Sequence, residues 1–164
     1  MATSSKPKYK YSCMRRAKLG VLESSMNVYF SCSITGGRSE EKVYQAMVAA
    51  MLAAGHEVPT AHLSSPEVID LEKISKPVEI YTRDMRWLEE CDVVVAEVST
   101  PSHGVGYEIA VGLAMQKPVL CCHERGKRVS KIITGNTNPT LRVVEYGDEE
   151  EAVQAVLQFL DRHA

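Results

Sequence analysis

Glu108 stands at the end of a run of residues that combines a strand pattern, a polar loop and a helix pattern. Val93–Val95 is β-branched and apolar, which is typical of a strand covered on both faces, and Ile109–Met115 is apolar nearly all round, as in a buried helix. The loop between them contains Ser102 and Gly104. Ligands of open parallel α/β sheets bind beyond the carboxyl ends of the strands. The run therefore predicts a ligand site.

The position of Glu108 predicts an ionised carboxylate. The pattern places it in the first turn of the helix, shortly after Gly104 and Gly106, where the helix dipole stabilises negative charge. An ionised carboxylate can act as a nucleophile or can stabilise a developing positive charge. The alternative interpretation is an acidic first-turn residue that serves only the stability of the helix.

Asp84 is a second carboxylate in an unexpected place. A helix over residues 78–90 would surround it with apolar and aromatic neighbours at steps of three, four and seven: Ile80, Tyr81, Trp87, Leu88 and Cys91. Burial without a partner costs several kcal/mol or forces a carboxyl group to keep its proton. A carboxyl with such a raised pKa is suited to donating a proton. The alternative is an acid near a helix end that pairs with a neighbouring arginine.

A loop between the first strand and the first helix offers groups that bind anions. They are the side chains or backbone N–H groups of Ser33, Thr35, Gly36, Gly37, Arg38 and Ser39. Such groups ahead of a helix N-terminus favour a phosphate. The loop matches neither G-x-G-x-x-G nor a Walker motif, which argues against dinucleotides and triphosphate hydrolysis. Together with the loop of Ser102 and Gly104, it suits a small phosphorylated ligand.

Strand and helix patterns alternate along the chain. Strands are predicted over residues 26–31, 56–60, 93–95, 118–123 and 141–146, and helices over residues 40–54, 78–90, 109–115 and 149–160, with a loop over 61–76. Ser39 could cap the first helix, and Gly55 ends it. This alternation predicts an α/β fold, a single flavodoxin-like (Rossmann-like) domain. We expect a five-stranded parallel sheet of order 2-1-3-4-5 with helices on both faces.

The charge distribution divides the chain at residue 24. Residues 1–24 contain six Lys or Arg residues and one Glu, a net charge of +5, which leaves −7 for residues 25–164. We expect a flexible basic arm over 1–24 and one compact domain over 25–164. A nucleic-acid or targeting role is the alternative for the arm. No secretory signal is recognisable, and no segment approaches the roughly 18 apolar residues of a membrane span.

Other polar residues have less specific patterns. The five cysteines, Cys13, Cys32, Cys91, Cys121 and Cys122, form no C-x-x-C pair and are interpreted as reduced thiols of an intracellular protein, with no metal site. The histidines suggest no Ser-His-Asp or Cys-His arrangement. Tyr29 ends the first strand, where its hydroxyl could bond a site carboxylate, although packing alone is the alternative. Glu97, an acid in an apolar strand run, is interpreted as a structural partner.

From about Val28 to Phe159 the sequence resembles the 2′-deoxynucleoside 5′-phosphate N-hydrolases, relatives of the nucleoside 2-deoxyribosyltransferases. The main resemblance is Asp84-x-x-Trp87-Leu88-x-x-Cys91-Asp92-Val93-Val94-Val95-Ala96-Glu97-Val98-x-x-Pro101-Ser102-x-Gly104-Val105-Gly106-Tyr107-Glu108. A second block is Tyr29-Phe30-x-x-Ser33-Ile34-x-Gly36-Gly37-Arg38. This resemblance implies hydrolysis of a 2′-deoxynucleoside 5′-monophosphate to free base and 2-deoxyribose 5-phosphate.

The resemblance also implies roles for individual residues. Glu108 would be the nucleophile, Asp84 the general acid, and Tyr29 the residue that positions the nucleophile. Substrate and phosphate contacts would come from Ser33, Ile34, Gly36, Gly37, Arg38, Ser102 and Gly104, from Ser130 of the other subunit of a homodimer, and from His62 on the base side. No metal or organic cofactor is implied, and neither a membrane nor a nucleic acid is an expected partner. The cytoplasm is the expected location, with the nucleus as an additional one.

Two residues depart from the family pattern, and two other functions remain open. Cys32 replaces a glycine and is expected to narrow the pocket, whereas Thr35 replaces an arginine and removes a charge near the phosphate. One alternative is a deoxyribosyltransferase, which passes the sugar to another base. The other is a catalytically silent nucleotide-binding module, because a fold alone does not establish activity.

Overall fold

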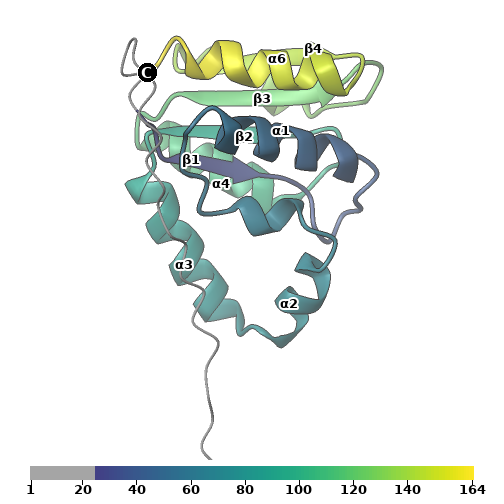
Figure 1. The fold of residues 1–164 in the computed structure, drawn as a ribbon, viewed down its shortest axis with the longest axis vertical. Helices are drawn as coiled ribbons and strands as arrows, with labels where there is room; N and C mark the ends of the chain where they lie inside the picture. Colours follow the sequence, from purple (N-terminus) through teal and green to yellow (C-terminus); the bar gives the residue numbers. More distant parts are fainter. Residues whose placement is uncertain (1–24) are drawn as a thin grey trace, which may run out of the picture.

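The computed structural model describes residues 25–164, so the predicted arm over 1–24 lies outside the described residues. The chain forms one parallel sheet (Figure 1). Its strands are β1 (Val28–Ser31), β2 (Val93–Glu97), β3 (Val119–Glu124) and β4 (Leu141–Tyr146), hydrogen-bonded in the order β1-β2-β3-β4. The carboxyl ends of all four strands therefore meet at one edge of the sheet.

Helices cover both faces of the sheet. They are α1 (Glu41–Ala53), the 3₁₀ helix η1 (Ala61–Ser64), α2 (Val68–Ile74), α3 (Pro77–Glu90), α4 (His103–Ala114), α5 (Lys131–Thr134) and α6 (Glu149–Leu160). In Figure 1, α1 and α6 lie on one side of the strands and α4 lies behind them. Among residues 25–164, no helix is long and apolar enough to cross a lipid bilayer.

The side chains of β2 alternate between two hydrophobic clusters. Val93 and Val95 pack with α1 and α6, whereas Val94 and Ala96 pack with α3 and α4. Successive side chains of a strand point to opposite faces, so a strand buried on both faces reads as a continuous apolar run. The expected α/β architecture with two covered faces is confirmed.

The predicted five-stranded sheet of order 2-1-3-4-5 is not confirmed, because the sheet has four strands. The segment predicted as the second strand makes only one bridge, between Asn27 and Glu57. Pro59 has no N–H to donate, and the carbonyl of Val58 accepts from the N–H of Ala61, so the chain turns into η1.

Three local predictions were wrong. The segment 61–76 contains η1 and α2 rather than a loop alone, and α5 was not predicted. Helix α1 begins after Glu40 and has no side-chain cap, so Ser39 does not cap it. The Glu40 carboxylate instead accepts hydrogen bonds from Thr100 and Lys127, which lie beyond β2 and β3. The start of α1 is thus fixed by tertiary contacts.

Candidate functional site

The carboxylate of Glu108 is held by two hydroxyl groups of β1. Tyr29 donates from its phenol oxygen to Oε1 over 2.8 Å, and Ser31 donates from Oγ to Oε2 over 2.5 Å. Residues two apart on a strand point to the same face, here the face that α4 covers. Each carboxylate oxygen therefore has its own donor, and of the two interpretations of Tyr29 the structure shows the hydrogen bond to a carboxylate rather than packing alone.

The predicted place of Glu108 in the first turn of its helix was wrong. Helix α4 begins at His103, and the Ser102 hydroxyl caps it by accepting from the N–H of Val105, so Glu108 lies in the second turn. The effect of the helix dipole falls off beyond the first turn. The hydroxyls of Tyr29 and Ser31, rather than the end of the helix, therefore stabilise negative charge on the Glu108 carboxylate.

Asp84 is buried on α3 and forms an ion pair with its neighbour Arg83, whose Nε lies 2.8 Å from Oδ1. This is the arrangement of the alternative interpretation. Asp84 nevertheless acts on the same site as Glu108. Burial raises the pKa of Tyr29 far above its usual range, and the charges of Glu108 and Asp84 raise it further. The two carboxylates thus lie within electrostatic reach of one phenol, which stays protonated and acts as a donor.

The two predicted anion-binding loops touch each other. A Cβ atom added to Gly36 would lie 2.4 Å from the carbonyl oxygen of Pro101 and 2.8 Å from Ser33 Oγ, so only glycine fits there. Gly37 has φ of +124°, which also favours glycine. Ser33 Oγ is buried and has no hydrogen-bond partner among the described residues. The loop after β1 and the loop after β2 therefore form one polar edge.

Arg38 has a structural role. Its Nε pairs with Glu41 over 2.7 Å, and its terminal nitrogens donate to the carbonyls of Leu63 and Ser65. The side chain is only 7% exposed. Arg38 thereby fixes η1 against α1, and a phosphate contact would require it to leave these partners. Its predicted role as a phosphate ligand stays a prediction that this geometry does not favour.

Cys32 and Ile34 belong to the packing beneath the loop. The Cys32 thiol donates to the carbonyl of Leu63 over 3.6 Å, and burial raises its pKa to about 12. Ile34 is half-buried and packs against the same hydrophobic cluster. The expected narrowing of the pocket by Cys32 is not what the structure shows, because its side chain is directed to η1 and the core.

His62 on η1 lies next to the carboxylate of α3. Its ring is 5.8 Å from that of Trp87, and the guanidinium of Arg83 lies 5.0 Å from the centre of the same indole. Burial and the charge of Arg83 lower the pKa of His62, while Asp84 acts in the opposite direction. Since Nε2 is buried, His62 is a neutral side chain near the acid.

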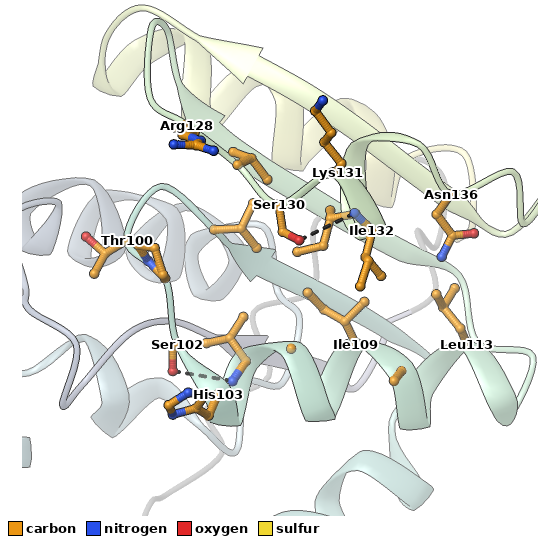
Figure 2. A pocket seen from close by; sticks show the side chains of 17 residues that line it. Thr100, Ser102, His103, Ile109, Leu113, Arg128, Ser130, Lys131, Ile132 and Asn136 are labelled. Carbon is orange, nitrogen blue, oxygen red and sulfur yellow. Dashed lines mark hydrogen bonds between the residues drawn. The ribbon is translucent and has the colours of Figure 1, made fainter.

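Ser102 and Ser130 line one cavity of about 820 Å³ between α4 and residues 128–136 (Figure 2). Much of its wall is apolar, with Val105, Ile109, Leu113, Val129, Ile132 and Ile133. Gly104 and Glu108 line a neighbouring hollow of about 540 Å³ between α3 and α4. His103 lies between the two, because it lines both.

Ser31 was missed in the sequence. The signal was its position two residues after Tyr29 on the same predicted strand, which places both hydroxyls on one face. Its small size and its place at the strand end gave no further indication. The described residues hold no group of three or more His, Cys, Asp or Glu side chains placed to bind a metal ion.

The family model of the nucleoside 2-deoxyribosyltransferases matches residues 28–152. The chain belongs to this family. All of β1, α3, β2 and α4, and therefore Tyr29, Asp84 and Glu108, fall within the matched range.

Relatives of this nucleoside 2-deoxyribosyltransferase family member have names that state an activity. A Methanosarcina mazei protein named 2′-deoxynucleoside 5′-phosphate N-hydrolase 1 is 35% identical over 155 residues, 92% of this chain and 96% of its own. A Thermofilum pendens protein of the same name is 43% identical over 131 residues, 79% of this chain and 91% of its own. The 5-hydroxymethyl-dUMP N-hydrolase of Danio rerio is 40% identical over 129 residues, 76% of this chain and 90% of its own.

A solved structure shares the fold. The CMP N-glycosidase BcmB of Clostridium botulinum superposes with a TM-score of 0.62 at 21% identity, covering 80% of this chain and 98% of that one. The predicted relationship to N-hydrolases of the nucleoside 2-deoxyribosyltransferase family is confirmed by the sequence relatives, and the fold by this structure.

Glu97 forms a separate buried network on the opposite face of the sheet. Its Oε1 accepts hydrogen bonds from Tyr146 over 2.8 Å and from Ser99, while Oε2 is buried without a partner among the described residues. The Ser99 hydroxyl accepts in turn from the N–H of Glu124. Glu97 thus ties the end of β2 to β3 and β4, which supports its interpretation as a structural partner.

Burial raises the pKa of Glu97 above its usual value of 4.5, so the folded state holds this proton more tightly than the unfolded chain. Stability is therefore expected to fall as pH rises from about 4.5 through the folded pKa. Glu97→Gln should lack this component, so its Tm relative to wild type should increase with pH, by about 4 °C for each 1 kcal/mol. Thermal melts between pH 4.5 and 8 test this, with exposed Glu57→Gln as control. Parallel curves for wild type and Glu97→Gln would contradict it.

Proposed function

We propose that the protein hydrolyses the N-glycosidic bond of 2′-deoxynucleoside 5′-monophosphates to free base and 2-deoxyribose 5-phosphate. The observation that carries this proposal is the Glu108 carboxylate, held by Tyr29 and Ser31, with the Asp84 carboxyl close to the same phenol. The names of the Methanosarcina mazei and Danio rerio relatives support the same reaction.

In the first step, an oxygen of Glu108 attacks the anomeric carbon while the bond to the base nitrogen breaks. The sugar acquires oxocarbenium character, which the carboxylate stabilises before it forms the ester. The electron pair of the broken bond leaves with the base, and Asp84 assists by transferring a proton to it. The two carboxyl groups have different surroundings, because Glu108 lies between two hydroxyls and Asp84 lies beside the guanidinium of Arg83.

In the second step, water attacks the anomeric carbon and gives a proton to the Asp84 carboxylate left by the first step, while the ester bond to Glu108 breaks. The electron pair returns to the carboxylate, and the sugar phosphate leaves. A base in place of water would give the transferase reaction, which the name of the family model favours as the second candidate. Because both reactions share the first step, they differ only in the acceptor.

The phosphate is proposed to bind at the polar edge formed by the two loops. Ser102 caps α4, so the N-terminal N–H groups of that helix face this edge, and the space beside Gly37 and Gly104 is open to an anion. Ser33 supplies a buried hydroxyl with no partner in the described part of the chain. Thr35, which carries no charge, is exposed on the same loop.

Ser130 is proposed to reach the phosphate of a second subunit in a homodimer. It caps the short helix α5 and lines an apolar cavity in which the neighbouring Ile132 is 83% exposed. A large exposed apolar side chain beside an apolar hollow supports burial against another copy. Sedimentation should therefore show a dimer, and full activity of a monomer would contradict the role in trans.

The base is proposed to lie near His62. The His62 imidazole and the Trp87 indole meet edge to face near Asp84, so a base placed there would be within reach of the proposed acid. Glu108 is proposed to pack against C2′ of the sugar. This contact would leave no room for a 2′-hydroxyl and would favour deoxyribose over ribose.

A substrate panel tests the proposed reaction. Purified protein is incubated with deoxynucleoside and ribonucleoside 5′-monophosphates, including 5-hydroxymethyl-dUMP, and with the matching nucleosides, and released base is measured by chromatography. We expect release from deoxynucleoside monophosphates and at least tenfold less from nucleosides, since phosphate contacts contribute binding energy to the transition state. Equal cleavage of nucleosides, or sugar transfer to an added base, would favour the transferase. Release of no base from any compound would favour a silent binding module.

A further inference from the structure

Ser31 makes a short hydrogen bond to the Glu108 carboxylate. Its Oγ lies 2.5 Å from Oε2, while Tyr29 serves Oε1 over 2.8 Å. A distance of about 2.5–2.7 Å is typical of a hydroxyl that donates to an ionised carboxylate. Ser31 is fully buried at the end of β1, whereas Glu108 is half-buried and lines a hollow, so the hydrogen bond joins the protein interior to the site. The hydroxyl thus faces the group proposed to react.

A donor at this place affects the two halves of the reaction differently. In the first step, the Glu108 carboxylate loses its negative charge as it forms an ester, and hydrogen bonds to it weaken. In the second step, the charge returns to the carboxylate as the ester bond breaks, and the same hydrogen bonds strengthen. A donor that stabilises the carboxylate therefore favours its departure from the sugar.

We propose that Ser31 is a positioning residue for the second half of the reaction, which speeds release of the sugar phosphate by donating a hydrogen bond to the departing carboxylate of Glu108. Water adds to the anomeric carbon and gives a proton to the Asp84 carboxylate, the bond from that carbon to Glu108 breaks, and the electron pair returns to the carboxylate that Ser31 and Tyr29 hold. This inference rests on the proposed nucleophilic role of Glu108.

The contacts around the carboxylate distinguish Ser31 from its neighbours. Tyr29, the other donor, also interacts electrostatically with the charges of Asp84 and Arg83. Removal of its hydroxyl would disturb both carboxyl groups at once. Cys32 is also within reach of the charge of Glu108, but its thiol is directed to Leu63. A change at Ser31 is thus the one that tests the carboxylate of Glu108 most selectively.

The test separates the two steps in Ser31→Ala. Base release is followed in single turnovers with 5-hydroxymethyl-dUMP. The mass of the acid-quenched protein is then measured by mass spectrometry to detect covalently bound deoxyribose phosphate. We expect base release in the first turnover to stay within about threefold of wild type. Breakdown of the adduct should slow by roughly 10- to 100-fold, the effect of losing a hydrogen bond to a charged group, so the adduct accumulates.

Matched variants decide between outcomes. Ser64→Ala removes another buried hydroxyl, bonded to the Ala61 carbonyl, and should not accumulate adduct. If Ser31→Ala does not fold, Ser31→Cys keeps the volume with a weaker donor and should show a smaller accumulation. Equal slowing of both steps, or no change, would overturn the inference. Glu108→Gln distinguishes failure of this inference from failure of the proposed function. If Glu108→Gln releases base as fast as wild type, Glu108 forms no adduct and the proposed function fails. If Glu108→Gln is inactive and Ser31→Ala still accumulates no adduct, only the role of Ser31 fails.

Discussion

Glu108→Gln is expected to lower the rate of base release by about four to six orders of magnitude, the effect of removing a covalent nucleophile. The amide of glutamine is nearly isosteric with the carboxylate. The Tyr29 hydroxyl can still donate to the amide oxygen, and the Ser31 hydroxyl can accept from the amide nitrogen. The fold should therefore survive while the attacking oxygen loses its charge, so the loss reports chemistry rather than unfolding.

The measurement is kcat for base release, with the Tm of each variant measured in parallel. Glu150→Gln, at an exposed site on α6, makes the same chemical change far from the site and should keep wild-type activity. Glu108→Ala adds a second readout: the space it leaves can admit azide, and formation of a glycosyl azide would place the attack at the anomeric carbon. Activity of Glu108→Gln within tenfold of wild type would refute the nucleophile and favour a silent binding module.

The sequence predicted those elements of the fold whose pattern is local. The buried strand at Val93–Val95, the amphipathic helix over 149–160 and the strand over 141–146 were all found where expected. The strand predicted over residues 56–60 was wrong, because a short segment joins a sheet only where its backbone can pair with a neighbouring strand. Only the tertiary structure shows that the chain bends at Pro59 after one bridge to Asn27. The number of strands could not be read from apolar runs alone.

The candidate site shows the same division between residue identity and geometry. The pattern selected Glu108 and Asp84 because carboxylates stood among apolar residues. It could not show that Glu108 lies one turn further into α4, and it left open whether Asp84 pairs with a neighbouring arginine, as it does with Arg83. The contacts of Arg38 show the same limit of sequence patterns. A guanidinium beside glycines suggests a phosphate ligand, yet its partners, Leu63 and Ser65, lie about 25 residues away in the chain.

Asp84→Asn is expected to slow cleavage by about two to four orders of magnitude on ordinary bases, the contribution of a general acid. The asparagine side chain keeps the volume of Asp84 and can still bond to a base, but it has no proton to transfer. The loss should therefore depend on the leaving base. Bases that depart readily as anions need little assistance, so 5-fluoro-dUMP should be affected less than dUMP.

The measurement is kcat/KM against the acidity of the departing base for a series of 5-substituted deoxyuridine monophosphates. Asp84→Asn should show a steeper dependence than wild type, because the variant cannot protonate a poor leaving base. Glu79→Gln, an exposed acid in the first turn of the same helix, controls for the change of charge on α3. Arg83→Gln removes the cation next to Asp84 but keeps the acid, and so controls for loss of the ion pair. If wild type and Asp84→Asn had the same slope, Asp84 would be a partner of Arg83 that orients the helix, and the proton would have to come from another group.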